Sequence, residues 1–140
     1  MTTAKDIMHR GTRWIPRHET LASAAQMMRD HGVGALPISD PDNGDRMCGI
    51  ITDRDIVVKC VAEGRDPARM TCGDIAEGTP RWVDAAADIS EVLREMEDHQ
   101  IRRVPVIENK RAVGMISEAD MARHLSEDKL AEFVQRVYAG

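Results

Sequence analysis

Two seven-residue stretches of the chain carry the same polar residue types at the same spacing. They read GIITDRD, from Gly49 to Asp55, and GMISEAD, from Gly114 to Asp120. In each, two apolar residues separate a glycine from a Thr or Ser, and an Asp follows three residues later. At the point where a strand runs into a helix, such a hydroxyl can donate to a phosphate or ribose oxygen, and the carboxylate can accept from both ribose hydroxyls. The motif therefore suits an adenosine-type ligand.

The same residues also suit a purely structural role. Thr52 with Asp55, and Ser117 with Asp120, match the capping pattern in which a hydroxyl accepts from a backbone N–H at a helix start. This explains the hydroxyl and the acid, but it does not explain the glycine before them. A glycine inside a strand often marks close approach by a ligand or by another backbone. Both interpretations of the motif therefore stay open at this point.

The two motifs belong to a repeat that runs along nearly the whole chain. Pro105 lies 68 positions after Pro37, and His99 lies 68 positions after His31. The motifs themselves are 65 positions apart, because the loop region that contains SDPDNGDRM in the first copy and ENKRA in the second is three residues shorter in the second copy. Surface loops tolerate such changes in length. The chain is therefore predicted to contain one unit twice.

Each copy predicts the same order of elements. A brief extended piece at Trp14-Ile15 or Trp82-Val83 precedes a helix whose apolar residues recur at helical spacing. Two strands follow, ALPI and CGIIT in the first copy and VPVI and AVGMIS in the second, and a helix starts directly after the last strand (DRDIVVKCVAEG or EADMARHLSE). We expect an α/β (α+β) fold in which two small sheets share a core. A last helix, at about 127–138, carries an apolar stripe typical of a core or dimer contact.

The composition excludes several classes of protein. The chain has 140 residues, 42% of them apolar and 31% charged, as expected of a globular domain. A net charge of −5 and 3% aromatic residues argue against nucleic-acid binding. We find no apolar run near the ~20 residues of a membrane span, no signal peptide and no CxxC pair, so we expect a cytoplasmic protein with free thiols. Motifs of the common catalytic sites are also missing, so we expect no enzyme.

The two motifs, each preceded by an x-h-P-h strand and by a DIM or DIA opening, resemble the cystathionine-β-synthase (CBS) domain. Two of them in tandem resemble a Bateman module, and the segments DIVVK and RRVPVI are also similar to the small stand-alone proteins of the hypoxic response protein 1 group of actinobacteria. The resemblance implies two β-α-β-β-α repeats packed as a pseudo-two-fold pair. It places the first repeat at 4–63, a linker at 64–71, the second repeat at 72–125 and a C-terminal helix at 126–140.

Modules of this family are regulatory, and they typically bind AMP, ADP, ATP or S-adenosylmethionine in two clefts between the paired sheets. The resemblance then assigns the ribose to Asp55 and Asp120, and phosphate contacts to Arg54 and Arg103. The residues implied at the nucleotide are, in full, Ile15, Ala35, Leu36, Pro37, Thr52, Arg54, Asp55, Val83, Arg103, Val104, Pro105, Ser117 and Asp120. Arg54 has Ala119 as its counterpart in the second copy, where Arg102 and Arg103 can compensate, so the two sites should differ. A homodimer and an unknown protein partner complete this hypothesis.

Other functions are open beside the nucleotide sensor. The first is a nucleotide-free dimeric stress-response or interaction protein, in which His99 and His124 of different chains bind zinc, with other ligands completing four positions. The structural explanation of His99 is a favourable interaction with the negative end of its helix. A third hypothesis makes the chain a subunit of an enzyme complex.

Overall fold

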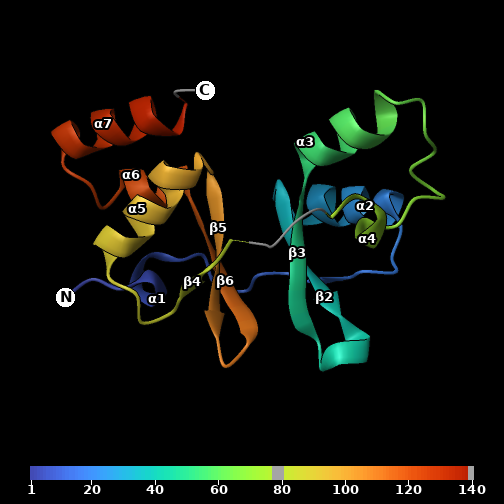
Figure 1. Cartoon of the computed structure of the whole chain (residues 1–140), viewed down its shortest axis with the longest axis horizontal. Helices are drawn as coiled ribbons and strands as arrows, with labels where there is room; N and C mark the ends of the chain where they lie inside the picture. The colour runs from blue at the N-terminus through green and yellow to red at the C-terminus, as the bar shows by residue number, and fades with distance from the viewer. Residues whose placement is uncertain (77–80, 139–140) are drawn as a thin grey trace. The chain divides into compact units, whose positions relative to one another are not determined.

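The computed structural model describes residues 1–76 and 81–138 and contains two compact units. The first-repeat unit spans Arg13–Pro80, and the second-repeat unit combines Met1–Thr12 with Arg81–Gly140. Each unit consists of a small sheet with helices packed on it (Figure 1). Among the described helices, none has the length and apolar character needed to cross a membrane.

The first-repeat unit is built on a three-stranded sheet in the order β1-β2-β3. Strand β1 is parallel to β2, and β2 is antiparallel to β3, with Ala35 opposite Thr52. The elements are β1 (Ile15–Pro16), α2 (Leu21–His31), β2 (Ala35–Asp40), a 3-10 turn (Pro41–Asn43), β3 (Arg46–Thr52), α3 (Asp53–Ile56), a π-helical turn η2 (Val57–Val61) and α4 (Cys72–Ile75). The expected helix after the motif is thus present, but it continues as the π-helical turn, in which Ala62 N donates to Val57 O at 2.8 Å.

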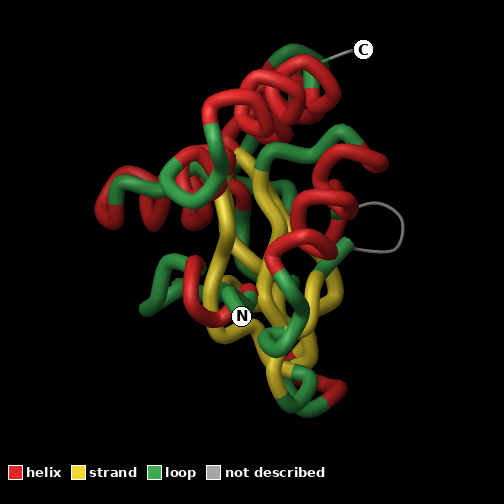
Figure 2. Tube along the Cα trace, turned by 90° about the vertical axis from the view of Figure 1, so that its left-hand side faces the viewer, coloured by secondary structure: helices red, strands yellow, loops and turns green. Residues whose placement is uncertain are grey.

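The second-repeat unit has the same sheet topology, in the order β4-β5-β6. Strand β4 is parallel to β5, and β5 is antiparallel to β6, with Arg103 opposite Ser117. The elements are α1 (Ala4–Ile7), β4 (Val83–Asp84), α5 (Ile89–His99), β5 (Arg103–Glu108), β6 (Arg111–Ser117), α6 (Glu118–Ala122) and α7 (Glu127–Val137). The mixed α+β fold and the order of elements predicted for both copies are confirmed; in Figure 2 the strands are yellow and the helices red.

Each unit has its own core of buried apolar residues. The core of the first-repeat unit includes Leu21 and Ile51, and that of the second-repeat unit includes Val92 and Ile116. Helix α7 adds Phe133 to the second core, while its neighbour Val134 stays 43% exposed. The apolar stripe predicted on this helix is therefore partly a core contact, and the described part of the first-repeat unit has no counterpart of α7.

The compact units do not follow the linear order of the repeats, because the opening segments are exchanged. The segment that opens the first copy packs on the sheet of the second, where His9 N donates to Met115 O at 2.8 Å and Met115 N donates to His9 O at 3.2 Å. Helix α4, which opens the second copy, packs beside β3 of the first-repeat unit. Residues of both copies thus contribute to each unit.

The three cysteines are free thiols, as the sequence predicts, and all lie in the first-repeat unit. Burial raises the pKa of Cys72 to about 11, with a further contribution from the charge of Glu19. Burial also raises the pKa of the Cys48 thiol. Thiolates are the reactive form, so neither of these cysteines suits nucleophilic chemistry at neutral pH.

Candidate functional site

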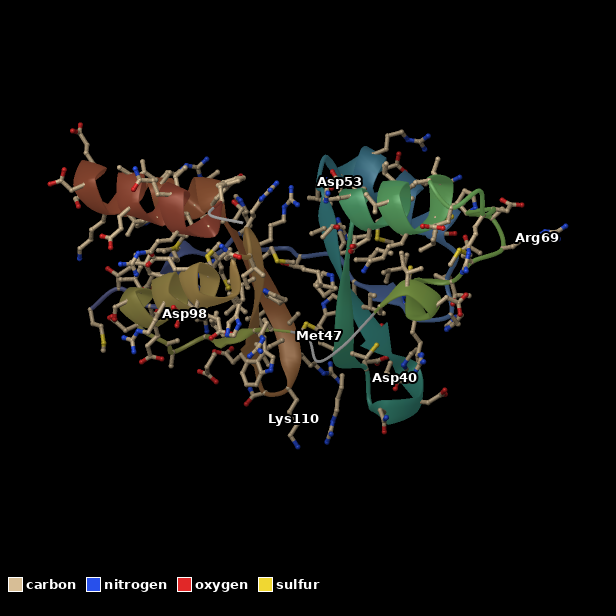
Figure 3. The ribbon with its side chains drawn as sticks, turned by 45° about the horizontal axis from the view of Figure 1, so that its top comes forward. Asp40, Met47, Asp53, Arg69, Asp98 and Lys110 are labelled. Carbon is tan, nitrogen blue, oxygen red and sulfur yellow. The ribbon has the colours of Figure 1, made fainter. Side chains whose placement is uncertain are left out.

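The two motifs lie at the junctions where β3 runs into α3 and β6 runs into α6. At the first junction, Asp55 N donates to Thr52 Oγ1 at 3.1 Å, and Thr52 N donates to Asp55 Oδ2 at 3.0 Å. At the second, Ser117 N donates to Asp120 Oδ2 at 2.8 Å, and Asp120 N lies 3.4 Å from Ser117 Oγ. Both motifs are reciprocal capping boxes, so the structural interpretation of the hydroxyl and the acid is confirmed. Figure 3 labels Asp53 at the start of α3.

The glycines of the motifs make room for the exchanged opening segments. A Cβ atom on Gly114 would lie 2.6 Å from His9 O and would also meet the Met8 side chain. A Cβ atom on Gly49 would lie 3.1 Å from the Cβ of Ala76, the residue 68 positions after Met8. Of the two explanations for these glycines, the described residues therefore support close approach by another segment of the chain.

The first motif keeps part of its polar groups at the surface. The Asp55 side chain is 26% exposed, and its Oδ1 lies 3.4 Å from Lys59 Nζ on the following turn. Arg54 is exposed beside it, while Asp53 Oδ1 accepts from Arg54 N at 2.9 Å. A half-buried hydroxyl, a partly exposed carboxylate paired with Lys59 and an exposed arginine thus belong to one helix start. This set can bind a ligand that carries both hydroxyl groups and negative charge.

The carboxylate of the second motif lies in a different environment. The Asp120 side chain is 3% exposed, and its Oδ1 lies 3.0 Å from His9 Nε2 and 3.7 Å from Arg123 Nη1. The sequence does not reveal this contact of His9, because His9 belongs to the opening of the first copy and nothing in the local pattern links it to Asp120. The two repeat-equivalent carboxylates therefore have different partners.

The apolar residues implied at the base are buried in their own units. Ile15 and Leu36 belong to the first core, and Val83 and Val104 belong to the second. Ala35, Pro37 and Pro105 are likewise buried, and Arg103 is half-buried. Strand β1 pairs with β2 at Ile38 and Ser39, past the Ala35–Pro37 stretch. What this stretch can offer to a base is consequently backbone rather than side chain.

The histidines proposed for zinc each have a partner within the second-repeat unit. His99 Nε2, at the end of α5, lies 3.6 Å from Glu95 Oε1. His124 Nδ1 lies 3.0 Å from the Asp120 carbonyl oxygen, so its other ring nitrogen can act as a metal ligand. Within residues 1–76 and 81–138, no group of three or more His, Cys, Asp or Glu side chains is placed to hold a metal ion. A site that used these histidines would need ligands from elsewhere.

Comparisons with known proteins place the motifs in context. The sequence profile of the CBS domain matches residues 4–61 and 72–127. The chain is similar to hypoxic response protein 1 of Mycobacterium tuberculosis, with 52% identity over 137 residues that cover 98% of this chain and 94% of that protein. It is also similar to the CBS domain-containing protein YhcV of Bacillus subtilis, with 30% identity over 126 residues that cover 87% and 84% of the two chains.

Solved structures give a matching result. The crystal structure of hypoxic response protein I, described as having two coordinated zinc ions, superposes with a TM-score of 0.80 and 54% identity, covering 89% of this chain and 100% of that one. The hexameric CBS-CP12 protein of bloom-forming cyanobacteria superposes with a TM-score of 0.78 and 30% identity, covering 87% and 70% of the two chains. Both likenesses extend over most of the present chain.

Proposed function

Because the chain belongs to the family of CBS-domain proteins, as a tandem pair of such domains, we propose that this regulatory, non-catalytic module binds an adenine nucleotide at its repeated motif. AMP, ATP and S-adenosylmethionine are the ligands to test. Binding shifts the population of module arrangements, and a protein partner in the cytoplasm senses the shift. The observation that carries the proposal is the first motif, where Asp55 stays 26% exposed beside Lys59 and the neighbouring Arg54 is exposed.

The chemistry of this motif matches a nucleotide group by group. The Asp55 carboxylate can accept from two ribose hydroxyls. The exposed Arg54 can contact a phosphate. The Thr52 hydroxyl, already an acceptor in the capping box, still has its own hydrogen to donate. One ligand can thus satisfy all of these groups.

Self-association is part of the proposal. Three valines of the π-helical turn are exposed at 43–58%, namely Val57, Val58 and Val61. A cluster of apolar side chains on one helical turn is typical of an interaction surface. The likeness to a hexameric CBS-CP12 protein supports an oligomer in general terms. We infer a homodimer in which this turn is covered.

Isothermal titration calorimetry with AMP, ATP and S-adenosylmethionine tests the nucleotide proposal. We expect saturable binding to the wild-type protein and its loss in Asp55→Ala. The matched control is Asp74→Ala, which breaks the same type of capping box, with Thr71, in the same unit and outside the motif. Flat titrations for all three ligands with folded wild-type protein, or equal losses in Asp55→Ala and Asp74→Ala, would contradict the proposal.

A second candidate function is a nucleotide-free dimer bridged by zinc. The observation that favours it is the likeness to hypoxic response protein I, whose structure is described with two coordinated zinc ions. Here we propose His99 and His124 of different chains as ligands. Zinc content by mass spectrometry, and dimerisation by light scattering with and without chelator, should both fall in His124→Ala and in His99→Ala. The control is His31→Ala, because His31 is the repeat-equivalent of His99. Unchanged zinc content in both test variants would exclude this site.

A further inference from the structure

The last described turn of α7 contacts the second motif. The Tyr138 hydroxyl donates to the Glu118 carboxylate, 2.7 Å from Oε2 and 2.9 Å from Oε1. The Tyr138 ring packs against Arg102, whose Cζ lies 4.3 Å from the ring centroid. The same turn is fastened by Arg136, whose Nε lies 3.4 Å from Glu97 Oε2. Glu118 at this helix start and Arg102 on the preceding segment are therefore both engaged by Tyr138.

The N-terminal segment engages Asp120, the carboxylate of the second motif. Asp120 uses Oδ2 in its capping box, and its Oδ1 lies 3.0 Å from His9 Nε2. His9 is 55% exposed and Asp120 is 3% exposed, so the imidazole rather than the carboxylate meets the solvent. The His9 backbone is fixed by its bridge to Met115. A ribose at the second motif would first have to displace the imidazole.

The equivalent groups of the first motif have different surroundings. Gly34 stands where the second copy has Arg102, and Asp53 is exposed where Glu118 is half-buried. Asp55 keeps 26% of its side chain exposed. The position that corresponds to His9 is 77, outside the described residues, and it holds a glutamate, a residue type that cannot form an ion pair with a carboxylate. The sequence also supplies no second helix like α7 after the first motif.

We propose that His9 and Tyr138 close the second motif, so that each chain binds one nucleotide, at the first motif. This inference rests on the proposed nucleotide function and assigns it to one of two copies. Its physical basis is competition. At the second motif a nucleotide must displace the Tyr138 hydroxyl from Glu118, the Tyr138 ring from Arg102 and the His9 imidazole from Asp120 before it makes its own contacts. At the first motif it meets a carboxylate that is 26% exposed and paired with Lys59 of its own helical turn, and an exposed guanidinium.

The binding stoichiometry of the full chain tests the proposal, with AMP as the probe in calorimetry. We expect one site per chain in the wild-type protein, and no site in Asp55→Ala. The double substitution His9→Ala with Tyr138→Ala should raise the stoichiometry to two, and adding Arg102→Ala should return it to one. Gln135→Ala, at an exposed position of α7 outside these contacts, is the control and should keep one site.

The outcomes separate this inference from the proposed function. Two sites in the wild-type protein would overturn the inference and leave the function standing, as would a single site in the double variant. A flat wild-type titration together with one site in the double variant, lost on Arg102→Ala, would overturn binding at the first motif and keep the closure of the second. Flat titrations for every variant would overturn both.

Tyr138 also provides a readout that needs no nucleotide. It is the one tyrosine in the sequence, so the phenolate absorbance of the intact protein reports this side chain alone. The hydrogen bond to Glu118 raises the pKa of Tyr138 above its ordinary value of 10.0. Glu118→Ala should therefore lower the titration midpoint, and Gln135→Ala should leave it unchanged. A wild-type midpoint at the ordinary value that Glu118→Ala does not move would show that Tyr138 does not hold the second motif in solution, and it would overturn the closure.

Discussion

The junctions β3–α3 and β6–α6 share a backbone and differ in the residues that reach them from elsewhere. Both carry a reciprocal capping box, and both follow a strand pair with the same register and a bulge at the same place. At the first junction, Asp55 pairs with Lys59 of its own helical turn. At the second, Asp120 pairs with His9, more than a hundred residues away in the chain. Duplication has thus copied the local geometry, whereas residues distant in the sequence decide what a solvent-borne ligand can reach.

The largest difference between the units is α7, and removing its anchor should destabilise one unit selectively. Phe133 is 1% exposed in the core of the second-repeat unit. Phe133→Ala should cost about 4 kcal/mol, the usual cost of emptying a buried aromatic position. Hydrogen exchange measured by mass spectrometry should show lost protection in β5 and β6 and retained protection in β2 and β3. Val134→Ala, at an exposed neighbour, is the control. Equal losses in both sheets would mean that the units open together.

Alanine substitutions of the two motif glycines should lower the free energy of unfolding more where the glycine is more crowded. Gly114→Ala brings a methyl group against the carbonyl oxygen of His9 and the side chain of Met8, so the backbone must shift, at a cost of about 3 kcal/mol. Gly49→Ala meets the Ala76 methyl at 3.1 Å and should cost about 1 kcal/mol. Urea unfolding of both variants measures the difference. A larger loss for Gly49→Ala would show that the described approach of the N-terminal segment to β6 is not maintained in solution.

Much of the local structure could be predicted from the sequence because it depends on neighbouring residues. The strand pairs, the helix starts at Thr52 and Ser117, and the offset between the copies follow from periodicity and capping. At the start of α5, Asp88 accepts from the N–H two residues later, whereas Thr52 and Ser117 accept from the N–H three residues later. A helix start offers several donors, and spacing alone does not choose among them.

The environment of the candidate site could not be predicted in the same way. The exchange of the opening segments brings His9 to Asp120, and α7 brings Tyr138 to Glu118. Such contacts between distant residues leave no periodic pattern in the sequence. The assignment of thirteen nucleotide-binding positions by family resemblance covers both copies, and it stays a prediction that substitutions and titrations can test.

The capping hydroxyls should have equal structural effects and unequal functional ones. Thr52→Ala and Ser117→Ala should each cost ~1 kcal/mol of stability, because each removes one acceptor at a helix start. If the first motif alone binds nucleotide, Thr52→Ala should also weaken AMP binding, while Ser117→Ala should not. Denaturation and calorimetry on the same samples separate the two effects. Equal weakening of AMP binding would argue for two working sites and against the closed second motif.

The smallest expected effect concerns a feature in which the units should agree. Asp6 in the second-repeat unit and Asp74 in the first-repeat unit are repeat-equivalent, and each accepts a backbone N–H at 2.9 Å, from Thr3 and Thr71. These hydrogen bonds lower the pKa of both carboxyls below their ordinary value of 3.8. A carboxyl whose pKa is lower in the folded state than in the unfolded state stabilises the fold at pH values above its unfolded pKa, about 3.9. This stabilisation is lost as the pH falls through the folded pKa. NMR titration should therefore find both carboxyls depressed to a similar extent. Should Asp74 titrate normally while Asp6 stays depressed, the common framework itself would differ between the units, and the contrast between Asp55 and Asp120 could no longer be attributed to His9 and Tyr138 alone.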